Sequence, residues 1–162
     1  MADLTVMEEK LAEVLGLAQA AQVAIDKVEG LVEDGEASEL LKQMREESEE
    51  TEQRCTDAAD QREGKKTAIL DKASETKSEG AEMMKIYLGE DSDELDGFEF
   101  LTMTEAGEVG HWAILGKLNE AAGEEGLKEL VDWALPLQEE HLKKVRETSL
   151  ELAAEEDPYS EE

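Results

Sequence analysis

The chain is poor in the residues that most often cross-link or interrupt a fold, with one cysteine, two prolines and 4% aromatics in 162 residues. Because Cys55 is alone, an intramolecular disulfide is excluded, and the sequence is compatible with a reducing compartment. No window approaches 18 uninterrupted apolar residues, and the first residues lack a basic segment followed by an apolar one. We therefore expect no membrane span, no signal peptide and a cytoplasmic location.

Positive charge is scarce as well. The 16 basic residues stand against 44 acidic ones, which gives a formal net charge of −28. Such a surface repels nucleic acids and anionic membranes, so neither is expected as a partner. The acidity is typical of solvated helix faces, which would serve solubility or salt adaptation. It would also suit a surface that gathers metal cations, and the charge alone does not separate these explanations.

What remains is typical of packed helices. The apolar residues are mostly Leu, Ala, Val and Met, they recur at steps of three and four, and no run of Val, Ile, Thr and Tyr suggests a strand. The spacing predicts long helices at about 3–32, from 36 to past 58, at 96–122 and at 124–153, with a less regular helix between the second and third. We expect an all-α protein with one bundle domain at 1–155 and an acidic flexible tail at 156–162.

The third long helix carries the sharpest chemical signal. Glu105 and Glu108 fall on its apolar stripe, where Leu or Ala would be expected. A buried carboxylate has to be neutralised, paired or bound to a metal. Glu108 and His111 have Glu-x-x-His spacing, which places both side chains on one helix face. Carboxylates and imidazole are ligands for iron, manganese or zinc, so this helix predicts half of a metal site.

The last helix offers Glu139, Glu140 and His141. By its stripe His141 points inward, with Glu140 beside it, although one inward histidine is also compatible with an ordinary core residue. Gln138 stands where a second Glu-x-x-His would need glutamate. Pro136 removes one backbone donor and should bend the helix just before the cluster.

The first two helices contribute less. On the second, Glu47 and Glu50 flank the stripe residue Thr51, within a run of acidic residues that must be mostly solvated. The first helix has no carboxylate on its stripe, and Gln22 lies beside it.

Three segments, one on each of the last three long helices, carry a resemblance to a known family. They are Glu47-x-x-Glu50-Thr51-x-Gln53, Glu105-Ala-Gly-Glu108 followed by Trp112, and Leu137-Gln-Glu139-Glu140. In these segments the chain resembles ferritin-like proteins, and most closely the short bacterial stress-associated YciE/YciF-type branch, with Glu47 in place of that group's histidine. The resemblance implies a ferritin-like four-helix bundle with a helical crossover between the second and third long helices, a homodimer and a dinuclear iron or manganese centre.

These observations lead to one main hypothesis. We expect a ferritin-like metal-binding protein, with a carboxylate-bridged di-iron or di-manganese centre used in oxidative or general stress. The expected ligands are Glu50, Glu105, Glu108, His111 and Glu140, with His141 bound to the metal or supporting a ligand.

Two other classes of function stay open. The chain could be a metal-free structural or stress-related helical dimer without catalytic activity, whose buried acids pair with Lys117, Lys143, Lys144 or Arg54. It could also be an acidic partner-binding module, which predicts an open apolar groove beside the crossover helix.

Overall fold

The computed structural model describes residues 2–33 and 35–161, which form five α-helices and no strand. The helices are α1 (Val6–Glu29), α2 (Glu36–Asp60), α3 (Lys66–Tyr87), α4 (Glu94–Ala122) and α5 (Glu125–Glu155). The expectation of an all-α protein is therefore confirmed. None of the described helices combines the length and the apolar composition that a membrane span requires.

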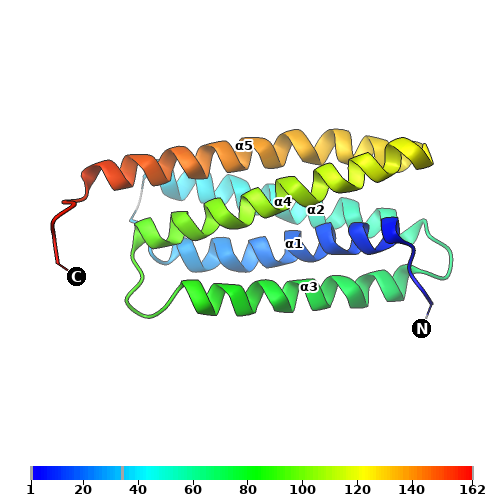
Figure 1. The fold of residues 1–162 in the computed structure, drawn as a ribbon, viewed down its shortest axis with the longest axis horizontal. Coiled ribbons are helices and arrows are strands. Elements are labelled where there is room, and N and C mark those ends of the chain that lie inside the picture. The colour runs from blue at the N-terminus through cyan, green and yellow to red at the C-terminus, as the bar shows by residue number, and fades with distance from the viewer. Residues whose placement is uncertain (1, 34, 162) are drawn as a thin grey trace.

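All five helices lie along one long axis (Figure 1). The chain alternates in direction, so that α1, α3 and α5 run one way and α2 and α4 run the other. Helix α1 contacts α2, α3 and α4, while α5 packs mainly on α4 and also meets α2. Helix α3 joins α2 to α4, packs mainly on α1 and contributes Ile69 and Ala73 to the core.

Hydrogen bonds at Thr5 set the start of α1. The Thr5 hydroxyl accepts from the Glu8 backbone N–H at 3.2 Å, and the Glu8 carboxylate accepts from the Thr5 N–H at 2.8 Å. This capping box satisfies two backbone donors of the first turn. At the other end the helix finishes at Glu29, with Gly30 as its cap. The predicted helix 3–32 is therefore too long at both ends.

The ends of α4 follow the same logic. Asp93 and Asp96 form a second capping box, with both hydrogen bonds at 3.0 Å, so α4 begins at Glu94. It ends before Gly123, which has a φ of +68°, a conformation that glycine adopts without steric cost. Asn119 closes the turn, because its side chain donates to the Glu124 carbonyl at 2.8 Å and accepts from the Glu124 N–H at 3.2 Å. The break predicted at Gly123 is confirmed.

Two apolar layers fill the core, one toward each end of the bundle. The first, which we call the Trp112 layer, includes Leu11, Val14, Leu15, Cys55, Ile69, Trp112, Leu115, Leu127 and Ala134. The second, which we call the Phe98 layer, includes Ile25, Val28, Leu41, Met44, Phe98, Leu101 and Val145. Along α2, α4 and α5, the residues between these layers bury polar side chains instead.

Helices α1 and α3 approach each other unusually closely. A Cβ atom built on Gly16 would collide with the backbone oxygen of Ala73 and lie 2.6 Å from Thr76 Cβ. One on Gly80 of α3 would lie 2.8 Å from the Cβ of Ala20 on α1. The absence of side chains at these glycines lets α3 pack closely against α1.

Candidate functional site

The middle of the bundle contains a group of buried polar side chains, which we call the polar layer. Every member is at most 3% exposed. The members are Ser48 and Thr51 from α2, Glu105 and Glu108 from α4, and Gln138 and His141 from α5. Glu47 of α2 lies at the edge of this layer, with 21% of its side chain exposed.

Helical spacing explains why these residues are buried. On α4 the buried positions run Leu101, Glu105, Glu108 and Trp112, in steps of four, three and four. The two glutamates therefore point into the bundle with the leucine and the tryptophan that flank them. The placement of Glu105 and Glu108 on the inward stripe is as the sequence predicts.

The same spacing acts on α5, where Ala134, Gln138, His141 and Val145 are all buried. Pro136 lies inside this helix and is exposed, and the helix continues through it. Because the proline ring has no N–H, one carbonyl in the preceding turn loses its helical donor. His141 faces inward, as its place on the stripe predicts.

Gln138 connects the two buried carboxyl groups. With its amide nitrogen turned toward them, Nε2 donates to Glu108 Oε2 at 2.6 Å and to Glu105 Oε2 at 2.8 Å. The opposite orientation would place the amide oxygen against two acceptors. One side chain of α5 therefore ties together two residues of α4, and it occupies the position where the sequence lacks a second Glu-x-x-His glutamate.

His141 is held on one side only. Its Nε2 atom lies 2.6 Å from Glu47 Oε2, a short hydrogen bond between α5 and α2. Its Nδ1 atom lies 3.7 Å from Glu105 Oε2, which is too long for a hydrogen bond. Among the described residues Nδ1 has no hydrogen-bond partner, and neither does the buried hydroxyl of Ser48. A buried nitrogen without a hydrogen-bond partner raises the free energy of the folded state, so its presence here calls for an explanation.

Burial and charge alter the acidity of the site. The pKa of Glu108 lies well above its usual value, chiefly because the group is buried and then because of the charge and hydrogen bonding of Glu105. Burial lowers the pKa of His141, but the contacts with Glu105 and Glu47 outweigh it and the net shift is upward. Both shifts favour protonated side chains, which reduces the repulsion among the clustered carboxyl groups.

Residues of α2 complete the surroundings. The Thr51 hydroxyl donates to the Glu47 carbonyl at 2.8 Å and so uses its proton within its own helix. Cys55 is fully buried, and its thiol pKa is raised by burial and then by the negative charges of Glu108 and Glu52. The thiol is therefore neutral, and it borders the polar layer as a small apolar group.

Three of the predicted ligands lie elsewhere. Glu50 has an exposed side chain that pairs with Arg54 at 2.9 Å, and Glu140 lies 3.9 Å from Lys144 on the surface of α5. His111 is 39% exposed; its Nδ1 atom lies 2.8 Å from the Gly107 carbonyl oxygen and its Nε2 atom lies 3.6 Å from Glu13. Of the six predicted residues, the structure thus gathers only Glu105, Glu108 and His141.

Two residues of the site were not among the predicted ligands. Glu47 lies within a run of acidic residues, so composition does not distinguish it from its exposed neighbours. Its position directly before the buried Ser48 nevertheless puts it near the core. Gln138 stands where a second Glu-x-x-His would need glutamate, which hides its own role, but its position on the α5 stripe marks it as buried. Within the described part of the chain, no group of three or more His, Cys, Asp or Glu side chains has a geometry ready to hold a metal ion.

Two of the cations expected as partners for the buried acids are engaged outside the core. Lys117 pairs with Glu120 at 2.7 Å, and Arg54 lies 4.1 Å above the ring of Trp133 besides pairing with Glu50. Among the described residues, no lysine or arginine forms an ion pair with Glu105 or Glu108. The Gln138 amide donates to both carboxyl groups instead, and the raised pKa of Glu108 favours a proton there.

Comparison with known proteins adds no family to this picture. No protein-family model matches the chain, and searches of curated proteins and of solved structures found no match either.

Proposed function

We propose that this chain is a ferritin-like bundle that binds a divalent metal ion, iron or manganese, at Glu105, Glu108 and His141, with Glu47 orienting the histidine ring through Nε2. One observation carries the proposal: the unpartnered Nδ1 of His141 lies 3.7 Å from the buried carboxyl group of Glu105, which the Gln138 amide links to that of Glu108. Carboxylate oxygens and one imidazole nitrogen are ligands that suit iron and manganese. The donor set therefore fits the proposed metal.

Helix arrangement supports the ferritin-like part of the proposal. Helices α1 and α5 run opposite to α2 and α4, and the connection between α2 and α4 passes through the whole of α3. A single long crossover of this kind is a feature of ferritin-like bundles.

The donor set favours one ion over two. A full dinuclear set takes one glutamate from each of two helices and Glu-x-x-His from each of the other two. Here α1 supplies no buried carboxylate at the polar layer, where it buries Ala18 and Ala21, and Gln138 replaces one glutamate. A bound iron or manganese ion would supply Lewis acidity and, for iron, electron transfer. The residues of this chain would supply the negative charge and release a proton as the ion binds.

Metal content and calorimetry test the proposal directly. The protein, purified without chelators, is analysed for iron, manganese and zinc, and the metal-free protein is then titrated with Mn²⁺ in excess Mg²⁺. Excess Mg²⁺ occupies the many surface carboxylates that bind cations weakly. We expect one tight site per chain, weakened at least tenfold in Glu108→Ala and unchanged in Glu140→Ala, which removes an exposed carboxylate of the same type. The same affinity for Mn²⁺ in Glu108→Ala as in Glu140→Ala, or no tight site in the parent protein, would refute the assignment.

A metal-free structural bundle is the second candidate, and one observation favours it. The Gln138 amide already bonds both buried carboxyl groups, and the raised pKa of Glu108 favours a proton there. In that case the polar layer only fixes how α2, α4 and α5 align. A melting temperature that stays constant on addition of Mn²⁺ or anaerobic Fe²⁺ would favour this function.

The proposed homodimer also has a surface to test. Met83, Ile86 and Tyr87 at the end of α3 are 41%, 77% and 56% exposed. Apolar side chains grouped in this way are typical of contact surfaces. Sedimentation velocity of the parent protein and of Ile86→Ser would reveal a dimer that depends on this surface.

A further inference from the structure

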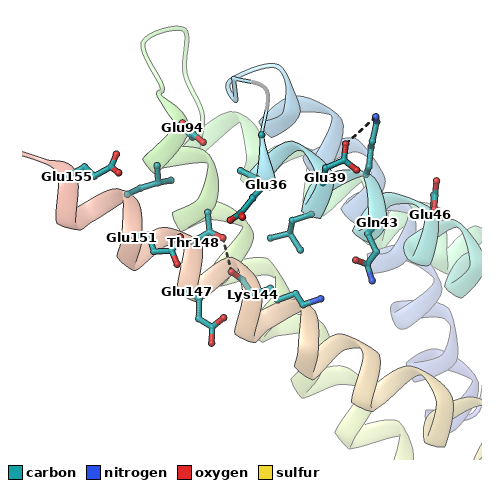
Figure 2. Close-up of a pocket in the computed structure, with 15 residues that line it drawn as sticks. Glu36, Glu39, Gln43, Glu46, Glu94, Lys144, Glu147, Thr148, Glu151 and Glu155 are labelled. Atoms are coloured by element: carbon teal, nitrogen blue, oxygen red, sulfur yellow. Dashed lines mark hydrogen bonds and ion pairs between the residues drawn. The ribbon is translucent and has the colours of Figure 1, made fainter.

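A groove of about 990 Å³ lies between the beginning of α2 and the end of α5 (Figure 2). It follows α2 from Glu36 to Glu46 and α5 from Lys144 to Glu155. Each stretch amounts to roughly 16 Å, or three helical turns, at about 1.5 Å per residue. This groove is a different one from the open apolar groove expected beside the crossover helix, because its lining includes no residue of α3.

The floor of this groove is apolar. Ala37 and Leu40 of α2 and Leu152 of α5 are partly buried and pack against the Phe98 layer from one side. Their other side faces the groove, together with Thr148. Residues 37 and 40, and likewise 148 and 152, lie three and four apart, so each pair forms a ridge along its helix.

The walls of the groove carry mostly negative charge. Figure 2 shows carboxylates from both sides of the groove and from the start of α4, and they belong to Glu36, Glu39, Glu46, Glu94, Glu147, Glu151 and Glu155. The lining includes two lysines: Lys42 lies 3.8 Å from Glu39, and Lys144 lies 3.9 Å from Glu140 outside the groove. Apart from Glu39, none of these wall carboxylates has an ion-pair partner within 4.0 Å in the described part of the chain.

The surroundings of the groove alter the acidity of Glu94. The pKa of Glu94 is raised, first by burial and then by the charges of Glu33, Glu155 and Asp93. A cation bound near Glu94 would relieve both the burial cost and the repulsion.

We propose that this groove binds a lysine- or arginine-rich amphipathic helix of a partner protein. The apolar floor would hold the apolar stripe of such a helix, as grooves between two helices commonly do. The wall carboxylates would pair with its flanking cations and speed its association. A second copy of this chain fits this groove poorly, because its acidic surface would face the wall carboxylates. A small polycation would use the walls but leave the floor exposed.

A designed peptide tests this inference. The probe is a fluorescently labelled peptide of about 15 residues with leucines three and four apart and lysines on both flanks, long enough to span the groove as a helix. Its binding to the full chain is followed by fluorescence anisotropy at about 0.15 M salt, where distant charges are screened. A peptide of the same composition in scrambled order, and spermine as competitor, measure general attraction to negative charge.

Two matched variants locate the binding. The groove variant replaces Glu36, Glu147 and Glu151 with Gln, and the control variant replaces the exposed residues Glu79, Glu82 and Glu129 with Gln, for the same change in charge. We expect the groove variant to weaken peptide binding about tenfold, because three partly screened ion pairs are lost together, and the control variant to change it less than twofold. Leu152→Ala, verified as folded by circular dichroism, should weaken it severalfold without any change of charge.

Three results would overturn the inference. Equal weakening in the two charge variants, or binding of the scrambled peptide as tight as that of the ordered one, would mean attraction to the whole acidic surface. Full displacement by millimolar spermine with no effect of Leu152→Ala would mean a small-polycation site. Self-association that only the groove variant abolishes, measured by sedimentation, would assign the groove to a second copy.

Discussion

The Trp112 layer and the polar layer are neighbours in the same core, and α2, α4 and α5 build both with the same steps of three and four. In one, these steps place Trp112, Leu115 and Leu127 inside. In the other, they place Glu105, Glu108, Gln138 and His141 inside. The comparison teaches that helical spacing decides which positions are buried, while the chemistry of each buried residue is a separate choice. An apolar choice stabilises the bundle, and a polar choice has to be compensated locally.

The largest effect is expected from truncation in the apolar layer. Trp112 is 1% exposed, so Trp112→Ala should lower the free energy of unfolding by about 3–5 kcal/mol, through lost burial and the cavity that remains. Chemical denaturation monitored by circular dichroism measures the change. Trp133→Ala provides the control, because that ring is only partly buried and carries Arg54 on its face, and its loss should be clearly smaller. Equal losses of unfolding free energy in the two variants would mean that burial in the Trp112 layer does not govern the stability of the fold.

The polar layer should respond in the opposite direction when its linked residues Glu105, Glu108 and Gln138 are replaced together. In the metal-free protein, the triple variant Glu105→Leu, Glu108→Leu and Gln138→Leu should be neutral or stabilising by up to about 4 kcal/mol, since these three buried side chains are removed together with the hydrogen bonds that join them. The same variant should abolish any rise in melting temperature with Mn²⁺.

The single variant Glu105→Leu sharpens that test. It removes one of the two acceptors of the Gln138 amide and the carboxylate nearest His141 Nδ1, so it should cost about 1–3 kcal/mol. If the triple variant were less stable than the single one, the polar network itself would be a source of stability.

The pH dependence of stability should come from the polar layer. The folded-state pKa values of Glu108 and His141 are raised, so the stability that each contributes is complete at low pH and is lost as the pH rises through the folded value. We expect the melting temperature of the metal-free protein to fall between pH 5.5 and 8.5, with each kcal/mol corresponding to about 2–4 °C for a chain of this size.

Glu108→Gln should flatten this profile, because the amide resembles the protonated acid and does not titrate. Trp112→Phe should lower the whole profile without changing its slope. A parent profile that rises over this range would contradict the raised pKa of Glu108.

The smallest effect lies outside both layers. Thr5→Ala removes the hydroxyl that caps α1 and should cost about 1 kcal/mol, independent of pH above 6 and of metal. Urea denaturation measures it, and Thr67→Ala, at an exposed position in the first turn of α3, serves as the comparison. A loss in Thr5→Ala as large as that in Trp112→Ala would mean that α1 docks through its end more than through its core face.

Much of the fold could be predicted because the apolar residues repeat regularly. The helix ends were less accurate, since they depend on hydrogen bonds at single residues such as Thr5 and Asp93 that the apolar pattern does not contain. The burial of Glu105, Glu108 and His141 followed from the stripe alone.

The rest of the site depends on contacts between helices. Short spacing favoured His111, but its ring turns back to the carbonyl of its own helix. Glu47 enters the site through a hydrogen bond to His141, a residue far away in the sequence. No pattern within one helix specifies how α2 is rotated against α5, so this pairing could not be predicted from the α2 sequence.

The close approach at Gly16 bears on how this chain can vary. By helix propensity alone, alanine would be preferred to glycine by up to about 1 kcal/mol in the middle of a helix. Here the added methyl group would meet the backbone oxygen of Ala73, and no rotation of a side chain could make room. Any substitution at this position therefore has to push α3 away from α1 as a whole. Gly16 adds no side chain to the core, yet the contact between α1 and α3 depends on that absence, so we expect glycine to be retained at this position.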